Sequence, residues 1–270
     1  MRDFSLLQYR SLLLDLQQAG YRFFTVAQYA RSVDDAPNVS SCLPAAPDAC
    51  RTAILRHDVD LLPENSVRTA QIEHDLGIRA TYYFRIVPES NRPECIRRIA
   101  AMGHEIGYHY EDLSTARGNL SEAWRFFSDN LAWFRTFYPV ETVCMHGAPR
   151  SGFDSRDLWK HYDYRSLGII AEPYLDFDYS RLFYLTDTGR RWDGYKVSVR
   201  DKIPVWQDRW NEAALTWHTT PQLAAAVRSG RLPAQVLVTT HPQRWTDSFV
   251  PWMRELLLQN AKNIVKRLLV

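Results

Sequence analysis

The chain has 270 residues, of which 46% are hydrophobic and 13% aromatic, and its formal net charge is +2. This length and apolar content suit one large α/β domain with a substantial core. The near balance of charge argues against a dedicated nucleic-acid-binding protein. The first residues carry several charges and no apolar run is long enough to span a bilayer, so we expect a cytoplasmic protein without a transmembrane segment.

The beginning of the chain predicts a lead-in to the main fold. Apolar side chains recur at helical spacing from Phe4 to Gln18, and Tyr21 to Phe24 is a short strand candidate. A second helix is expected over Val26 to Arg31. The stretch from Asp34 to Asp48, rich in Pro, Ala, Ser and Asn, predicts a surface loop.

After this loop, strand-like runs alternate with helical runs. The expected strands are Thr52–His57, Ala80–Val87, Glu105–His109, Thr142–Met145, Gly168–Ile170, Lys196–Val199 and Gln235–Thr240. The expected helices are Asn65–Leu76, Pro93–Met102, Ser121–Tyr138, Pro221–Arg228 and Trp252–Leu269. Such alternation predicts a parallel sheet or barrel. We therefore expect a single domain, residues 1–270, with its core at about 52–245, a lead-in at 1–50 and a terminal helix at 251–270.

Two aspartates follow the first core strand directly. In an extended chain Asp58 and Asp60 point to the same side, and two carboxylates that close repel each other unless one holds a proton or a cation lies between them. A divalent metal is the usual solution. The alternative interpretation is an Asp-rich turn that caps the helix beginning near Pro63.

Histidines stand at the ends of three other predicted strands: His109, His146 and His241. In parallel sheets and barrels the chemistry collects at the carboxyl ends of the strands. One such residue alone would more often be a capping or packed residue. Four strand ends that all carry polar side chains indicate a metal-dependent active site.

The same strand ends carry short motifs. Gly103–His109 reads Gly-His-Glu-Ile-Gly-Tyr-His, His57–Asp60 reads His-Asp-Val-Asp, and Leu237–His241 is a strand that ends in His. These runs resemble the second, first and fifth motifs of the polysaccharide deacetylase family (the NodB-homology domain, carbohydrate esterase family 4), and the second is the most specific match. His146–Pro149 falls where this family has its third motif. The matches occur in order between about residues 53 and 245.

A further run, Tyr184–Trp192, resembles a divergent subgroup near surface-polysaccharide and O-antigen gene products, which act in lipopolysaccharide biosynthesis. Within it, Arg190 could orient Asp58 or bind an anionic substrate group, and Trp192 could line the cleft. A surface Arg pair beside a core Trp explains the same residues equally well. Glu111, Arg190 and Trp192 are the candidates for substrate contact.

The resemblance implies a distorted (β/α)7 barrel of the NodB-homology type, with an N-terminal helical lead-in and a C-terminal helix. It implies hydrolysis of an N-acetyl or O-acetyl group on a sugar of a surface polysaccharide or its precursor. A divalent metal, zinc above all, would polarise the acyl carbonyl and activate water. By position, Asp58 is then the catalytic base, Asp60 and His109 are metal ligands, and His241 is the general acid.

One departure from the family concerns the metal ligands. The family has a second His four residues after the first, but this chain has Leu113 there. His146 is the favoured replacement, with Glu111 close behind and Asp112 as a third candidate.

Two other functions fit the same residues. One is a metal hydrolase on the same barrel that acts on an amide outside a sugar, and release of acetate from acetylated glycans would separate it from a deacetylase. The other is a catalytically inactive barrel that binds carbohydrate. Such a barrel would hold no metal and would not depend on Asp58.

Overall fold

The computed structural model describes residues 2–34, 51–148, 151–192 and 202–269. The strands are β1 (Tyr21–Phe24), β2 (Arg51–Val59), β3 (Thr81–Phe84), β4 (Glu105–Tyr110), β5 (Val143–Met145), β6 (Phe183–Thr186) and β7 (Gln235–Thr240). The α-helices are α1 (Leu6–Gln18), α2 (Val26–Asp34), α3 (Pro63–Asp75), α4 (Pro93–Ala101), α5 (Asp112–Thr115), α6 (Leu120–Arg135), α7 (Pro173–Asp176), α8 (Pro204–Glu212), α9 (Thr220–Arg228) and α10 (Phe249–Leu269). Short 3-10 helices are η1 (Ser155–Lys160), η2 (Tyr164–Leu167), η3 (Thr188–Arg190) and η4 (Pro242–Arg244). None of the helices within these ranges is long and apolar enough to cross a bilayer.

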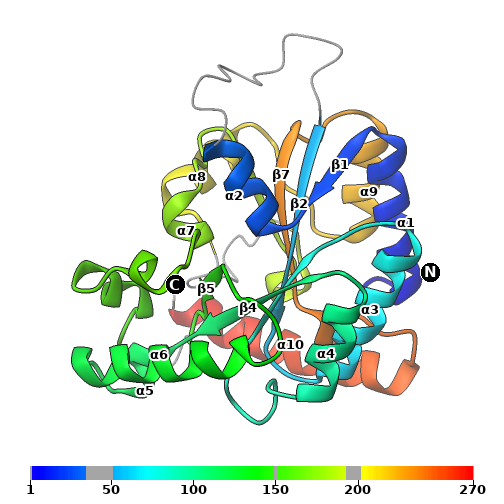
Figure 1. The fold of residues 1–270 in the computed structure, drawn as a ribbon. Coiled ribbons are helices and arrows are strands. Elements are labelled where there is room, and N and C mark those ends of the chain that lie inside the picture. Colours follow the sequence, from blue (N-terminus) through cyan, green and yellow to red (C-terminus); the bar gives the residue numbers. More distant parts are fainter. Residues whose placement is uncertain (1, 35–50, 149–150, 193–201, 270) are drawn as a thin grey trace.

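The strands of the described residues form one parallel sheet in the order β5-β4-β3-β2-β7-β6. β1 pairs with β2 along Arg51–Ile54, and β3 pairs with the same edge of β2 further on, along Arg56–Val59. The sheet curls into a half-barrel with helices around it (Figure 1). The expected α/β class with a parallel, barrel-like sheet is therefore confirmed, and the lead-in contributes a strand to that sheet.

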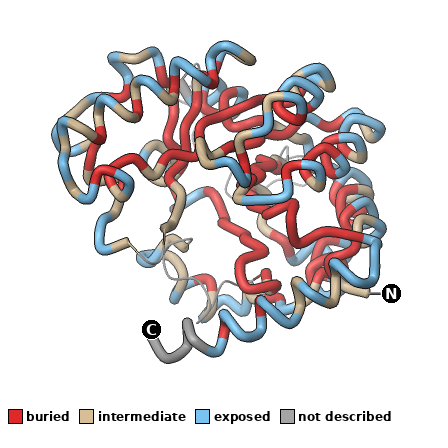
Figure 2. The backbone as a smooth tube through the Cα atoms, turned by 90° about the horizontal axis from the view of Figure 1, so that it is seen from below, coloured by how far each residue is buried: buried red, intermediate tan, exposed pale blue. Residues whose placement is uncertain are grey.

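Successive side chains of β2 point to opposite sides of the sheet. Arg56 lies inside the curl, where its guanidinium carbon is 4.8 Å from the ring centre of Tyr174 and 5.9 Å from that of Tyr83. His57 points outward, to Glu73 on α3. β2 is buried along nearly its whole length because both faces of the sheet are covered. Figure 2 shows that buried segments run through the interior of the fold and that the exposed ones lie around it.

A buried carboxylate fixes α1 and α3 to the outer side of the sheet. Glu73 accepts hydrogen bonds from the hydroxyl groups of Tyr9 and Tyr82, and its Oε1 lies 2.7 Å from His57 Nε2. Burial acts to raise the pKa of Glu73, but His57 outweighs burial and lowers it. A buried charge satisfied from several sides holds the last turn of α3 against β2 and α1.

Most of the predicted elements are confirmed, with ends shifted by about three residues or fewer. The run Gly168–Ile170 forms no strand, because Gly168 adopts a positive φ as the cap of η2; beyond it, Ala171 makes only an isolated bridge to Thr142. The expected strand at 196–199 and nearly all of the expected loop at 34–48 lie outside the described residues. β6 and α8 were not among the predicted elements.

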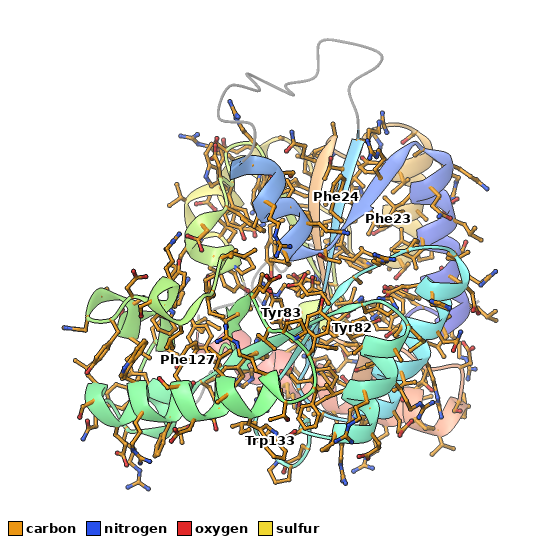
Figure 3. The ribbon with its side chains drawn as sticks, viewed as in Figure 1. Phe23, Phe24, Tyr82, Tyr83, Phe127 and Trp133 are labelled. Atoms are coloured by element: carbon orange, nitrogen blue, oxygen red, sulfur yellow. The ribbon has the colours of Figure 1, made fainter. Side chains whose placement is uncertain are left out.

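Gly107 in β4 lies opposite the aromatic ring of Tyr83, which is labelled in Figure 3. A Cβ atom added at Gly107 would lie 2.2 Å from Cε1 of that ring, and the Tyr83 hydroxyl is held by Thr142 Oγ1 at 2.8 Å. We therefore expect Gly107→Ala to lower the free energy of unfolding by about 1–3 kcal/mol in a urea titration. Gly152→Ala is the control, since no described atom lies within 4 Å of its added Cβ. Equal losses in the two variants would contradict this prediction.

Candidate functional site

Polar side chains from four strands meet at the carboxyl end of the sheet. Asp58 lies near the end of β2 and Asp60 just beyond it, His109 lies in β4, His146 follows β5, and His241 follows β7. Asp60 Oδ1 is 3.8 Å from His109 Nε2 and 3.6 Å from His146 Nε2. Asp60 Oδ2 is 3.9 Å from His241 Nε2. The structure thus brings together the five residues predicted for catalysis and metal binding.

The imidazole of His109 is held with its Nε2 toward the aspartates. Its Nδ1 lies 2.9 Å from the carbonyl oxygen of Cys144, which can only accept a hydrogen bond, so Nδ1 carries the proton. Burial lowers the pKa of His109 to about 4, and the ring is therefore neutral near pH 7. Nε2 then presents a lone pair to Asp60 and to Asp58, whose Oδ2 is 3.6 Å away.

His146 is oriented in the same manner by Glu111. The His146 Nδ1 atom lies 2.8 Å from Glu111 Oε2, and a carboxylate oxygen only accepts, so the second nitrogen again faces Asp60 with a lone pair when the ring is neutral. Glu111 in turn accepts from the Arg85 Nε at 2.9 Å. Burial acts to raise the pKa of Glu111, but His146 and Arg85 outweigh it and lower that pKa to about 2. Glu111, predicted as an alternative ligand or a substrate contact, is thus engaged by His146 and Arg85.

Asp60 Oδ1 is buried, and no described residue donates a hydrogen bond to it. The Nε2 atoms of His109 and His146 lie 3.8 and 3.6 Å away, beyond hydrogen-bond distance, whereas the other oxygen of Asp60, Oδ2, accepts from Gln243 Nε2 at 3.3 Å. Buried carboxylate oxygens are normally hydrogen-bonded or bound to a cation. An anionic oxygen beside two imidazoles is an arrangement that a cation between the three side chains would satisfy when both rings are neutral.

The two distances from Asp60 Oδ1 to the imidazole nitrogens suit a zinc-sized ion after a small inward movement. Ligand atoms at about 2.0–2.2 Å from a tetrahedral zinc are about 3.4 Å from one another. The two distances from Asp60 Oδ1, 3.6 and 3.8 Å, are slightly longer. Over the described ranges, no three His, Cys, Asp or Glu side chains are already closed around one point. Two imidazole nitrogens and one carboxylate oxygen form a donor set that zinc accepts.

Asp58 is held by an arginine from its own strand. The Nε of Arg56 donates to Asp58 Oδ1 at 2.8 Å and Nη2 donates to Oδ2 at 2.6 Å, and both side chains are buried. This two-pronged pairing fixes the plane of the carboxylate. The sequence analysis did not single out Arg56, although its position two residues before Asp58 puts both on one strand face.

His241 is held by a second buried carboxylate, Asp187, which directly follows β6. Asp187 Oδ1 lies 2.6 Å from His241 Nδ1, and Oδ2 accepts from the indole of Trp245 at 2.9 Å. Arg244 also donates to Oδ1. Burial and Arg244 act to lower the pKa of His241, but Asp187 outweighs them and raises it. Asp187 was not among the residues predicted from the sequence. Its position directly after the apolar run Phe183–Thr186 is the feature that could have indicated it.

Arg190 and Trp192 are not brought to this cluster. The Arg190 guanidinium lies 4.7 Å from the ring centre of Phe4 and 5.3 Å from that of Trp252. Trp192 is 1% exposed, and its indole donates to Thr220 Oγ1 at 3.0 Å. The structure places both in the packing between the lead-in, α9 and α10 instead of at a substrate cleft.

Comparison with known proteins gives no family for this chain. No protein-family model matches it, and no curated protein matches it.

Asp112, the third candidate ligand, is buried away from the cluster. It accepts hydrogen bonds from the Tyr108 hydroxyl at 2.8 Å and from Asn130 Nδ2 at 2.8 Å, and the neighbouring Leu113 is buried in the apolar core. Burial raises the pKa of Asp112 to about 7. The side chain is therefore packed as a structural group that holds a proton more tightly than an exposed carboxyl does.

This raised pKa has a measurable effect on stability. The folded chain holds the Asp112 proton up to pH about 7, whereas the unfolded chain releases it near pH 4. We therefore expect the free energy of unfolding to fall as the pH rises from about 4 to about 7, by roughly 1–4 kcal/mol from this group. Urea titrations across that range should show a flatter dependence in Asp112→Asn. An unchanged slope would show that Asp112 is ionised in the folded protein.

Proposed function

We propose that this chain is a metal-dependent hydrolase of the polysaccharide deacetylase type, which removes an N-acetyl or O-acetyl group from a sugar. The observation that carries the proposal is Asp60 Oδ1, a buried oxygen that accepts no hydrogen bond from the described residues and lies 3.8 and 3.6 Å from the Nε2 atoms of His109 and His146. The motif resemblance supplies the sugar and the acetyl group. It also supplies the finer fold assignment, a (β/α)7 barrel of the NodB-homology type.

Asp60, His109 and His146 would hold the metal. When bound there, a divalent ion such as zinc supplies a Lewis acid that polarises the acyl carbonyl and makes water more acidic. Glu111 keeps the proton of His146 on Nδ1 and so leaves Nε2 free to coordinate. The carbonyl oxygen of Cys144 keeps the proton of His109 on Nδ1 and so leaves Nε2 of that ring able to coordinate.

Asp58 is the residue placed to take the proton of the attacking water. Its Oδ2 lies 3.6 Å from the His109 nitrogen, so it borders the metal position. Arg56 donates a hydrogen bond to each carboxylate oxygen of Asp58. Asp58 therefore has little freedom to turn and coordinate the metal itself. This pairing gives Asp58 the role of base and leaves the role of ligand to Asp60, although both residues come from the end of β2.

His241 is the residue placed to give a proton to the departing amine or alkoxide. Its Nε2 faces Asp60 Oδ2 at 3.9 Å from the β7 side of the cluster. Asp187 holds the Nδ1 proton and stabilises the doubly protonated ring, and it raises the pKa of His241. A proton donor of this kind contributes about 10²–10⁴-fold to the rate.

Metal content is the first test of this proposal. Because the ligand atoms come from three side chains, His109→Ala, His146→Ala and Asp60→Asn should each retain less than about a tenth of the zinc that the unchanged chain binds after reconstitution and dialysis. The exposed His161→Ala is the matched control and should retain all of it. Full zinc content in His146→Ala would move the third ligand to another side chain, and absence of zinc from the unchanged chain would remove the hydrolase proposal.

Acetate release tests the roles of the base and the acid. On N-acetylglucosamine oligomers, Asp58→Asn and His241→Gln should both lower kcat by about 10²–10⁴-fold and should keep their metal. On an aryl acetate, whose phenolate leaves without a proton, Asp58→Asn should remain impaired while His241→Gln should recover most of the rate.

One control variant and two contrary outcomes make this test decisive. Asp58→Asn leaves the buried Arg56 charge unpaired, so the double variant Arg56→Met/Asp58→Asn serves to separate lost folding from lost catalysis. Equal losses of His241→Gln on both substrates would contradict the acid role. A metal-loaded chain that releases no acetate from any acetylated glycan would favour the hydrolase of a non-sugar amide.

A further inference from the structure

The helix α10 has an apolar face that no other part of the described chain covers. Its inner face is packed: Gln259 and Asn263 are buried, and Asn263 Nδ2 donates to the carbonyl oxygen of Gly189 at 2.9 Å. The large apolar side chains of its outer face are between 48% and 74% exposed. These are Phe249, Val250, Leu257, Leu258 and Ile264. At helical spacing Val250, Leu257, Leu258 and Ile264 lie on one side of the helix, with Arg254 among them, and Phe249 lies beside them in the first turn. This set of apolar residues is called the stripe below.

This stripe lies at the carboxyl end of the sheet. α10 packs against η3, which follows β6, and its Glu255 lies 4.0 Å from Arg244 in η4, which follows β7. Figure 1 shows α10 across the lower end of the fold, and Figure 2, seen from below, shows its exposed outer turns. The helix therefore borders the same end of the molecule as Asp60 and the histidines.

Further exposed apolar residues lie outside the helix. Leu7 is 59% exposed and its backbone N–H lies 3.3 Å from Asp247 Oδ1, two residues before α10. Leu61 and Leu62, which directly follow Asp60, are also exposed. Exposed apolar side chains gathered on one helix face are typical of an interaction site.

The charges around the stripe are mainly cationic. On the part of α10 whose side chains are described, Arg254 and Lys262 are exposed, whereas the carboxylate Glu255 turns inward to Arg244. At the start of the helix, Arg2 lies over the rings of Phe249 and Trp252 at 5.4 and 5.7 Å. Arg10 and Arg68 line a groove with Leu7, and Asp247 is the one carboxylate among the described residues that line it. Aliphatic and aromatic side chains interleaved with Arg and Lys are typical of a helix that lies in a membrane interface.

We propose that this face docks on an anionic lipid surface, with α10 lying in the plane of the interface and the carboxyl end of the sheet held close to the lipid. A second copy of the chain is a poorer occupant, because an α10-to-α10 pairing would set Arg254 and Lys262 near the same cations of the partner copy without an exposed carboxylate on the described helix to pair with them. The proposal does not rest on the hydrolysis proposed above.

Vesicle binding tests this proposal with the full chain. The unchanged protein should float with phosphatidylglycerol vesicles, bind phosphatidylcholine vesicles about tenfold more weakly or less, and be released by about 0.5 M salt. Val250→Ser/Leu257→Ser and Arg254→Gln/Lys262→Gln should each weaken binding about tenfold or more. Val205→Ser on α8, 75% exposed and away from α10 in Figure 1, is the matched control and should bind as before.

The same samples give the outcomes that would overturn the inference. Absence of binding to phosphatidylglycerol, or equal binding by the unchanged protein and both double variants, would remove it. A dimer in sedimentation velocity that the α10 variants abolish would assign the face to a second copy instead. Unchanged thermal unfolding of the variants shows that a loss of binding comes from the surface and not from misfolding.

Discussion

A single carboxylate oxygen, Asp60 Oδ1, sets the condition that the rest of the cluster has to meet. This oxygen is buried and lacks a donor among the described residues, although Oδ2 of the same carboxylate accepts from Gln243. A buried carboxylate oxygen without a donor loses free energy of solvation that a nearby positive charge can compensate. The strands β2, β4 and β5 converge on this point, and the side chains they bring there are of the types that bind a cation in the proposed function.

The groups behind the cluster explain why the imidazoles cannot turn away. Glu111 accepts a hydrogen bond from His146 Nδ1 and a second one from Arg85, which follows β3. His241 is backed by Asp187, which Arg244 and the Trp245 indole also hold. Each ring therefore has one nitrogen committed to a neighbour and one free. Outer partners of this kind fix the protonation pattern and orientation of metal-binding and acid–base histidines.

The sequence was sufficient for most of the elements, although not for β6 and α8, and for Asp58, Asp60 and the three histidines at the strand ends. Both follow from local periodicity and from the rule that parallel strands share a carboxyl edge. The sequence was insufficient for the second partner of each residue. Glu111 was a candidate ligand in the sequence, but in the structure it is bound by Arg85, which follows β3. Asp187 stands in the run Tyr184–Trp192, which was interpreted only as a subgroup motif. Trp192 was assigned to a cleft, whereas contacts with residues far away in sequence, such as Thr220, bury it. Such pairings depend on tertiary distance, which spacing along the chain does not encode.

The pairing of β2 with β7 also bears on how the chain reaches its fold. These neighbours at the middle of the sheet come from opposite ends of the sequence: His57 and Thr240 contact each other across 183 positions. During synthesis β2 emerges before β7, so the edge of β2 that β7 covers stays without this partner until residue 240 has left the ribosome. Sheets that depend on such distant contacts fold slowly and expose an edge that other chains can join. We therefore expect the late pairing of β7 with β2 to limit the rate at which this sheet forms.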